Sequence, residues 1–200
     1  GLTLTTGNSS GITDSGTVTV GGNFSATTDA NSGVINMGTM AVDGSFTLAP
    51  NSTGAVTIVN DAGLNLAAST MGGTFNGTAT TGNITDSGAL AITGTTTLVT
   101  SANNATITLD TTTNAFTGAL TITTNDSSGT DADVTIDGGT TALIIAASTI
   151  DGDLTLTSGN SSGITDSGTV TVGGNLSATT DANNGVIDLG TAAVTGTVAL

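Results

Sequence analysis

GNSSGITDSGTVTVGGN occupies residues 7–23, and the same letters return at residues 159–175. The match belongs to a longer repeat, in which residues 2–42 align with residues 154–194 at a constant offset of 152 positions. A third, looser copy reads NITDSGALAITG at residues 83–94. Self-similarity of this kind is the signature of stacked supersecondary units, each of which buries its apolar face against the next.

A shorter period lies beneath the long one. Eight glycines are each followed by a stretch in which apolar and polar side chains alternate, which is the pattern of a β-strand and not of a helix. Their spacings run from 21 to 34 residues and centre on 22. They predict an all-β fold, a parallel β-helix (β-solenoid) with three strands and about 22 residues per turn, continuous as one array through residues 1–200. These turn glycines are Gly22, Gly44, Gly73, Gly94, Gly118, Gly152, Gly174 and Gly196.

Like residues are expected to stack on like in successive turns. Phe24, Phe46 and Phe75 should form an aromatic stack in three successive turns. Six glycine-marked turns separate Gly22 from Gly174, so the long repeat should advance about 29 Å at about 4.8 Å per turn. A second strand of each turn should place one isoleucine in the core, namely Ile12, Ile35, Ile58, Ile84, Ile107, Ile136, Ile164 and Ile187.

The composition excludes several classes of function. The chain contains no Lys, Arg, His or Cys, and its fifteen acidic residues, all Asp, give a formal net charge of −15. Nothing can neutralise phosphates, so nucleic acid is not an expected partner. No thiolate or imidazole is available for nucleophilic catalysis or an ordinary zinc site, and there is no lysine for a Schiff base. No apolar run approaches the roughly eighteen residues that a membrane-spanning helix needs. The sequence therefore predicts neither an enzyme nor a membrane span.

Asp-Ser-Gly occurs three times, at residues 14–16, 86–88 and 166–168. Aspartic proteases use two such motifs, whose carboxylates share one proton. That dyad needs two lobes that face each other across a cleft, whereas here the copies fall between strands that lie several turns apart. Asp and Gly also favour turns, so the sequence predicts a solenoid corner at each copy and no catalytic residue.

An acidic residue or its amide recurs at a predicted corner of nearly every turn. Carboxylates stacked about 4.8 Å apart repel each other by roughly 0.9 kcal/mol in water. Hard cations such as calcium, which take several oxygen ligands, could bridge them; the alternative is a solvated edge screened by salt. Calcium is thus a candidate cofactor. Its candidate ligands are Asp14, Asp86, Asp110, Asp137, Asp166 and Asp188.

Threonine pairs such as Thr3/Thr5 and Thr121/Thr123 allow a more remote interpretation, the flat Thr array of an ice-binding solenoid. Such arrays need equal turns and unbroken pairs, whereas an equivalent position here reads Thr47/Ala49. The pattern therefore favours the ordinary preference of a β-branched residue for a solvent-facing strand.

The phrases ITDSGTVTVGGN, ITDSGALAITGTTTL and NAFTGALTI resemble the repeat region of large secreted bacterial β-helical exoproteins, the filamentous-haemagglutinin-like group exported by two-partner secretion. The resemblance covers essentially the whole chain. It implies a right-handed parallel β-helix that is extracellular or on the bacterial cell surface. It also implies a role in adhesion, biofilm or fibre building.

We therefore expect a structural, non-catalytic segment of a longer repeat protein that forms a fibre, sheath or stalk. No polar cap covers the first or last repeat, so the strand edges should continue into more chain or another subunit, which predicts self-association end to end or side by side. The main alternative is the stalk of an adhesin whose binding domain lies elsewhere and contacts a host cell or matrix. A β-helical polysaccharide enzyme is a remoter alternative, because such enzymes recruit Lys, Arg or His, all absent here.

Overall fold

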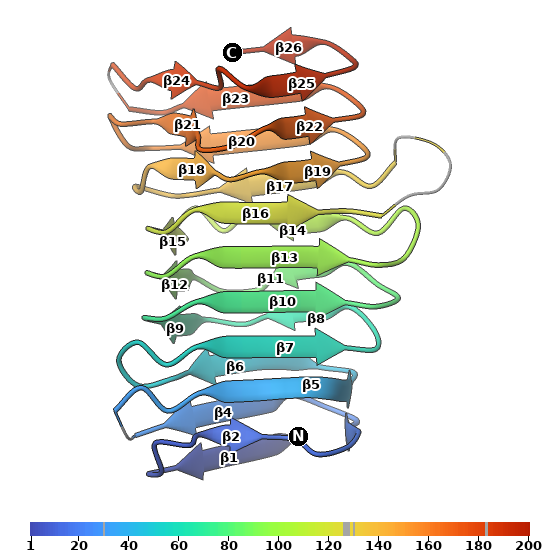
Figure 1. The fold of residues 1–200 in the computed structure, drawn as a ribbon, viewed down its shortest axis with the longest axis vertical. Helices are drawn as coiled ribbons and strands as arrows, with labels where there is room; N and C mark the ends of the chain where they lie inside the picture. Colours follow the sequence, from blue (N-terminus) through green and yellow to red (C-terminus); the bar gives the residue numbers. More distant parts are fainter. Residues whose placement is uncertain (30, 126–128, 130, 183) are drawn as a thin grey trace.

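The computed structural model describes residues 1–29, 31–125, 129, 131–182 and 184–200, and within them it contains strands and connections but no helix. The strands coil around one axis, with the two termini at opposite ends (Figure 1). All strand pairings are parallel, for example β1 (Leu2–Thr6) on β4 (Phe24–Thr28). In Figure 1 the chain rises from the N-terminus at the bottom, with the near-side strands running to the right and the far-side strands to the left. The coil is therefore right-handed. The predicted right-handed parallel β-helix is confirmed.

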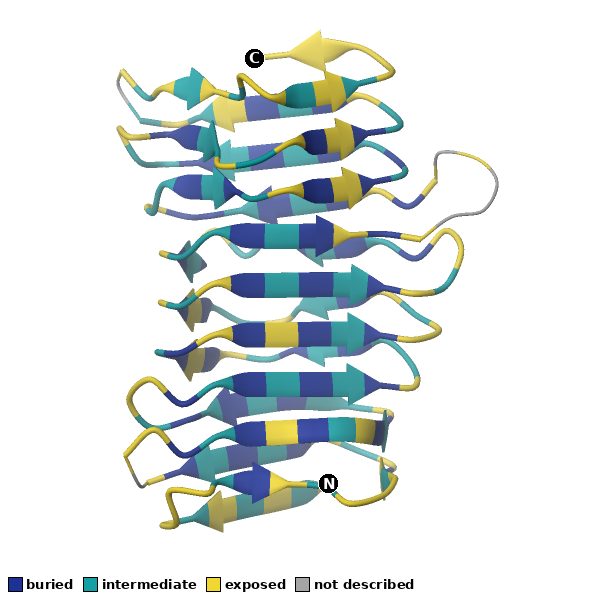
Figure 2. Cartoon of the chain, in the orientation of Figure 1, coloured by how far each residue is buried: buried dark blue, intermediate teal, exposed yellow. Residues whose placement is uncertain are grey.

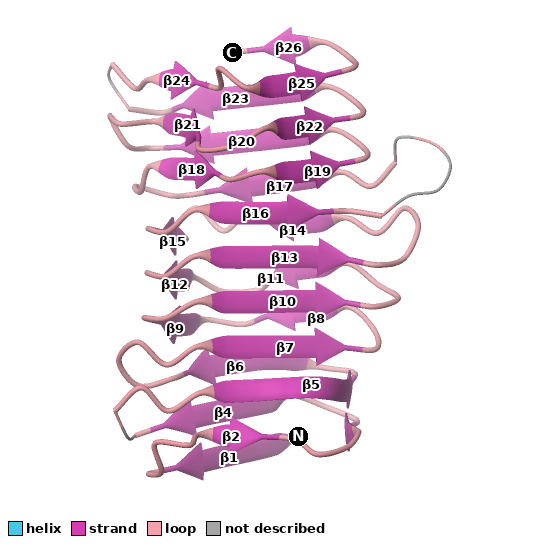
Figure 3. Cartoon of the chain, viewed as in Figure 1, coloured by secondary structure: helices cyan, strands magenta, loops and turns pink. Residues whose placement is uncertain are grey.

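Two long sheets, here called sheets A and B, form the broad faces, and a short sheet C lies at one edge of the middle turns (Figure 3). Sheet A contains β1, β4, β6 (Ser45–Ala49), β8 (Leu64–Leu66), β11 (Ile84–Asp86), β14 (Ile107–Leu109), β17 (Val134–Asp137), β20 (Leu154–Ser158), β23 (Leu176–Thr180) and β26 (Val198–Ala199). Sheet B contains β2 (Ile12–Thr13), β3 (Val18–Val20), β5 (Ile35–Val42), β7 (Val56–Asn60), β10 (Phe75–Ala79), β13 (Thr96–Thr100), β16 (Leu120–Thr123), β18 (Leu143–Ile145), β19 (Ser148–Ile150), β21 (Ile164–Asp166), β22 (Val170–Val172), β24 (Ile187–Asp188) and β25 (Ala192–Val194). Sheet C contains β9 (Ser69–Met71), β12 (Leu90–Ile92) and β15 (Ala115–Phe116).

The turns are more uniform than the glycine spacing suggests. Register partners in neighbouring strands of sheet A lie between 20 residues apart, as Leu64 and Ile84 do, and 27 apart, as Ile107 and Val134 do. Most turns contain the three strands that the sequence predicts. The turns β4–β5 and β6–β7 contain only two. In the first of them, β5 is long enough to pair with both β2 and β3 of the turn beneath it.

The turn glycines mark two corners of the solenoid, not one. Gly22, Gly44, Gly152, Gly174 and Gly196 precede strands of sheet A, whereas Gly73, Gly94 and Gly118 precede strands of sheet B. The two long spacings between turn glycines, 29 residues from Gly44 to Gly73 and 34 residues from Gly118 to Gly152, are the places where the turn glycine moves from one corner to the other. Sheet A consequently contains seven turns between β4 and β23, not the predicted six, and the long repeat advances about 34 Å at about 4.8 Å per turn.

These glycines are needed because the backbones of successive turns approach closely at the corners. A Cβ atom on Gly94 would lie 2.4 Å from the carbonyl carbon of Gly73, and one on Gly44 would lie 2.5 Å from that of Gly22. None of the eight turn glycines has a positive φ. Among the described glycines, positive φ angles occur elsewhere, as at Gly11 and Gly163. Close approach is therefore the physical reason for glycine at these corners.

The core is one continuous column of buried Val, Ile, Leu, Met and Phe side chains. Figure 2 shows the buried positions in dark blue, alternating with less buried positions along the strands. Phe24 and Phe46 pack with ring centroids 5.8 Å apart and planes tilted by 57°. Phe75 lies in sheet B, paired with Val56 and Thr96, so the predicted three-ring stack is wrong. The cause is the change of corner, which moves the strand after Gly73 to the opposite face. The change also divides the isoleucines: Ile12 stacks on Ile35 in sheet B, and Ile84 on Ile107 in sheet A.

Candidate functional site

The Asp of each Asp-Ser-Gly copy ties its corner to the next turn. Asp14 Oδ1 accepts a hydrogen bond from the Gly38 N–H at 3.0 Å. Its Oδ2 accepts from the Thr39 N–H at 2.8 Å and from the Thr39 hydroxyl at 2.7 Å. The Thr39 hydroxyl in particular, together with these N–H groups, holds the pKa of Asp14 below its ordinary value, although slight burial opposes this. We call this arrangement the corner clamp.

The corner clamp recurs in the other two copies of the motif. Asp166 Oδ2 accepts from the N–H of Thr191 at 2.8 Å and from its hydroxyl, which lowers the pKa of Asp166 in the same way. Asp86 accepts from the N–H groups of Asp110 and Thr111, both at 3.3 Å. The side-chain amide of Asn114, which is buried, donates to Asp86 at 2.6 Å. The motif is a corner, as predicted, and its carboxylates hold turns together.

A second set of side chains, which the sequence analysis missed, performs the same task one residue before the strands of sheet A. Asp153 Oδ1 accepts from the Asn175 N–H at 2.6 Å, and Asn175 Oδ1 accepts from the Thr197 N–H at 2.9 Å. Asn23, Asn83 and Asp133 accept in the same way from the equivalent residue of the following turn. The signal was present in the sequence, because an Asn or Asp directly before an apolar strand can satisfy the free N–H of a neighbouring turn.

Buried polar side chains fill the insides of several corners and were also missed. The Asn60 amide is fully buried; its Oδ1 accepts from the Val42 N–H at 2.9 Å and its Nδ2 donates to the carbonyls of Val42 and Gly63. Ser69 Oγ accepts from the Leu48 N–H and donates to the Ala67 carbonyl. Each therefore replaces a backbone partner where a strand ends inside the solenoid.

The six predicted calcium ligands do not form one ladder. Asp86 and Asp110 lie on neighbouring turns, but Asp86 pairs in register with Leu66, Asp137 with Thr157 and Asp188 with Thr165. Asp137 Oδ1 accepts from the Gly139 N–H at 2.7 Å. Among the described residues, no group of three carboxylates is close enough to hold a metal ion. Calcium binding stays a prediction.

The threonine pairs are divided between the two faces in the same manner. Thr3 and Thr5 lie in β1 of sheet A, whereas Thr121 and Thr123 lie in β16 of sheet B. On sheet A, Thr85, Thr108, Thr135, Thr155 and Ser177 nevertheless form one outward row in register over five turns. The result is a hydroxyl-rich, uncharged strip on the middle of this broad face.

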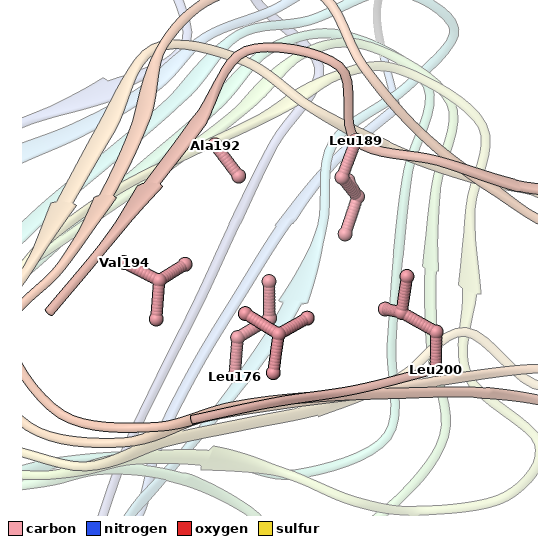
Figure 4. A pocket seen from close by; sticks show the side chains of 6 residues that line it. Leu176, Leu189, Ala192, Val194 and Leu200 are labelled. Atoms are coloured by element: carbon pink, nitrogen blue, oxygen red, sulfur yellow. The ribbon is translucent and has the colours of Figure 1, made fainter. Parts of the chain in front are cut away.

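A hollow of about 290 Å³ at the C-terminal end is lined by six aliphatic side chains (Figure 4). They are Leu176, Leu189, Ala192, Val194, Val198 and Leu200. One long repeat earlier, each equivalent residue, from Phe24 to Leu48, is at most 2 % exposed. The hollow is therefore a cross-section of the solenoid core, and none of its six lining residues has a polar side chain.

The fold and these turn-to-turn contacts define a β-solenoid repeat protein. Two segments, residues 53–123 and 131–200, match the family model described as repeats of unknown function (DUF5649). The chain belongs to that family. No curated protein and no solved structure matches it. In the part of the chain that the structure describes, no helix is long and apolar enough to cross a membrane.

Proposed function

We propose that the chain is a structural, non-catalytic repeat segment of an extracellular or surface-attached bacterial protein, in which stacked turns build a fibre, sheath or stalk. The observation that carries the proposal is the set of hydrogen-bond partners of the polar side chains. The Asp, Asn and Ser side chains described above bond to the backbone of a neighbouring turn or of their own corner. Hydrogen bonds directed in this way join each turn to its neighbour and so stabilise the stack of turns.

The charge distribution supports the same proposal. Each Asp that the structure describes lies in a connection or is the last residue of a strand, so the acids are confined to the edges of the solenoid. With no Lys or Arg to pair with them, they repel the acidic edges of neighbouring rods and leave the uncharged broad faces as the surfaces for lateral contact. An acidic rod without bases also fits the proposal that nucleic acid is not a partner.

The resemblance to filamentous-haemagglutinin-like exoproteins supports the surface location and leaves the adhesin stalk as the second candidate. In that case the present segment is a spacer, and a separate domain contacts the host cell or matrix. Self-association of the segment is expected for a fibre and is not needed for a stalk.

Immunogold electron microscopy with antibodies against the purified 200-residue chain tests the proposal on intact cells of the producing bacterium. Gold aligned along surface filaments is the expected result for a fibre, and gold on single projections indicates a stalk. Label that appears only after the cells are opened would contradict both. An unrelated cytoplasmic protein, probed in parallel, controls for leakage.

A further inference from the structure

The two segments that match the family model are repeats of one unit, yet their corresponding strands lie on opposite faces of the solenoid. LNLAAST at residues 64–70 corresponds to LIIAAST at residues 143–149, and ITDSG at residues 84–88 corresponds to ITDSG at residues 164–168. The offsets are 79 and 80 positions. These pairs fix which strands of the first segment correspond to which strands of the second.

Corresponding strands of sheets A and B exchange sheets. β8 and β11 lie in sheet A, and their counterparts β18 and β21 lie in sheet B. β10 and β13 lie in sheet B, and their counterparts β20 and β23 lie in sheet A. From β10 the chain takes half a turn to reach β11 and three further turns, through β14 and β17, to reach β20. The same count, three and a half turns, separates every one of these pairs.

We infer that the repeat unit of this family is three and a half solenoid turns, so that successive repeats place corresponding strands on opposite broad faces of the rod. At about 4.8 Å per turn, neighbouring units are related by a half-turn and a rise of about 17 Å. The 152-residue repeat is then two units. In agreement, β4 and β23, which are 152 positions apart in the sequence, both lie in sheet A.

The half-turn preserves local contacts, which shows that the units are equivalent in structure as well as in sequence. Ser69 Oγ accepts from the Leu48 N–H at 2.9 Å and donates to the Ala67 carbonyl at 2.8 Å. Its counterpart Ser148 accepts from the Ile122 N–H at 3.0 Å and donates to the Ala146 carbonyl at 2.8 Å. The Asp86 and Asp166 clamps are a second such pair, one in each sheet.

The two broad faces receive corresponding strands, and several corresponding outward positions keep a hydroxyl, as Thr85 and Thr165 or Thr97 and Ser177 do. Other outward positions differ, as Asn65 and Ile144 do, and the described Asp residues are confined to strand ends and connections. A second copy of this chain that contacts the shared hydroxyl positions of one unit therefore finds the corresponding positions on the other side of the same molecule. For the fibre proposed above, lateral contacts can then form on two opposite sides; only this last consequence rests on the proposed function.

Spin-label distances within single molecules test the inference directly. The chain has no native cysteine, so nitroxides can be attached to the double variant Thr97→Cys/Ser177→Cys, which labels corresponding outward positions of β13 and β23. Two same-face pairs bracket its axial separation: Thr108/Ser177 spans three turns of sheet A and Thr85/Ser177 spans four. Their axial separations are about 14 and about 19 Å.

The Thr97/Ser177 distance is expected to exceed both controls, at about 25 Å or more, because about 17 Å of rise combines with about 10 Å between the sheets and with label arms that point in opposite directions. A distance between the two controls would place the units on one face and overturn the inference. The pair Thr85→Cys/Thr165→Cys repeats the test on β11 and β21, and it decides the matter if the first variant lacks the wild-type β-sheet circular dichroism spectrum. The measurement concerns one molecule, so its failure would leave the surface location and fibre role untouched.

Discussion

The ITDSG copies at residues 12–16 and 164–168 and the copy at residues 84–88 share their letters but not their place. In the outer copies the strand before the corner, β2 or β21, belongs to sheet B, and the strand two elements later belongs to sheet A. In the middle copy β11 belongs to sheet A and β13 to sheet B. In all three copies the Asp nevertheless accepts hydrogen bonds from backbone N–H groups of the following turn.

The motif therefore specifies a strand, a corner and a clamp. It does not specify which broad face of the solenoid the strand joins. Both broad faces offer a parallel strand to pair with and an apolar column to pack against, so the local sequence gains nothing by choosing one of them. The face follows from the phase of the coil, which accumulates over the lengths of all preceding connections. Five measurements test these differences between the copies and between the two faces.

Removing a phenylalanine ring from either face should have the largest effect. Phe46 in sheet A and Phe75 in sheet B are both fully buried, and truncation to Ala should lower the free energy of unfolding by about 3–5 kcal/mol in each case. Denaturant unfolding measures the loss. A double-mutant cycle should find a ring–ring coupling of about 0.5–1.5 kcal/mol between Phe24 and Phe46. Equal coupling between Phe46 and Phe75 would contradict their placement on opposite faces.

The glycine of the ITDSG motif should respond differently in its copies. A Cβ on Gly88 would lie 2.6 Å from the backbone nitrogen of Ala68, whereas one on Gly16 would meet nothing within 4 Å. Gly88→Ala should therefore destabilise the chain by about 1–3 kcal/mol through overpacking, and the control Gly16→Ala should leave the denaturation midpoint nearly unchanged. Equal effects would show that the corner itself, and not the turn beneath it, requires the glycine.

The clamp should act on both faces, with a strength that depends on burial. Asp166→Ala should cost no more than about 1 kcal/mol, because its hydrogen bonds are exposed to solvent. Asp86→Ala should cost more, since it also removes the partner of the buried Asn114 amide. Asp188→Ala, at an exposed strand end, serves as the control and should change thermal stability least. A reversed order would show that these carboxylates do not hold the turns together.

Acid should weaken the clamps in the outer copies. The pKa values of Asp14 and Asp166 are lowered on folding, so the unfolded chain binds more protons than the folded chain as the pH falls below about 4. Their stabilisation is therefore complete above the unfolded pKa and is lost as the pH falls through the lowered folded value. Melting temperatures between pH 2 and 6 should fall more steeply for the wild type than for Asp14→Asn/Asp166→Asn. If the melting temperatures of the wild type and the variant fall in parallel with pH, the clamps do not contribute to the loss of stability in acid.

Calcium should have the smallest effect. The carboxylates of Asp14, Asp86 and Asp166 already accept hydrogen bonds from the next turn, so a cation would have to displace these donors. Adding calcium should raise the melting temperature no more than sodium chloride at equal ionic strength, through screening alone. A larger rise that a chelator reverses would reveal a specific site.

Much of the fold was predictable from alternation and repetition alone. The strands, the parallel coil and the corners at Asp-Ser-Gly follow from residue types whose conformational preferences are local. The prediction that all eight turn glycines mark one corner is wrong at Gly73, Gly94 and Gly118. A glycine that permits close approach of two backbones has the same sequence pattern at either corner. The clamps made by Asp14 and Asn23 were missed as contacts, since each partner lies a full turn away in the sequence.

The sequence by itself determined that this chain is a β-solenoid, with Val, Ile and Leu inside, Thr outside and Asp at the edges, because period-two alternation and turn chemistry act over a few residues. Only the tertiary structure decided which face each strand joins, that Phe75 leaves the stack of Phe24 and Phe46, and that seven turns separate the two copies of the opening stretch. The physical reason is that strand pairing between turns is a long-range property. It depends on the sum of all connection lengths along the coil, and identical local motifs cannot record that sum.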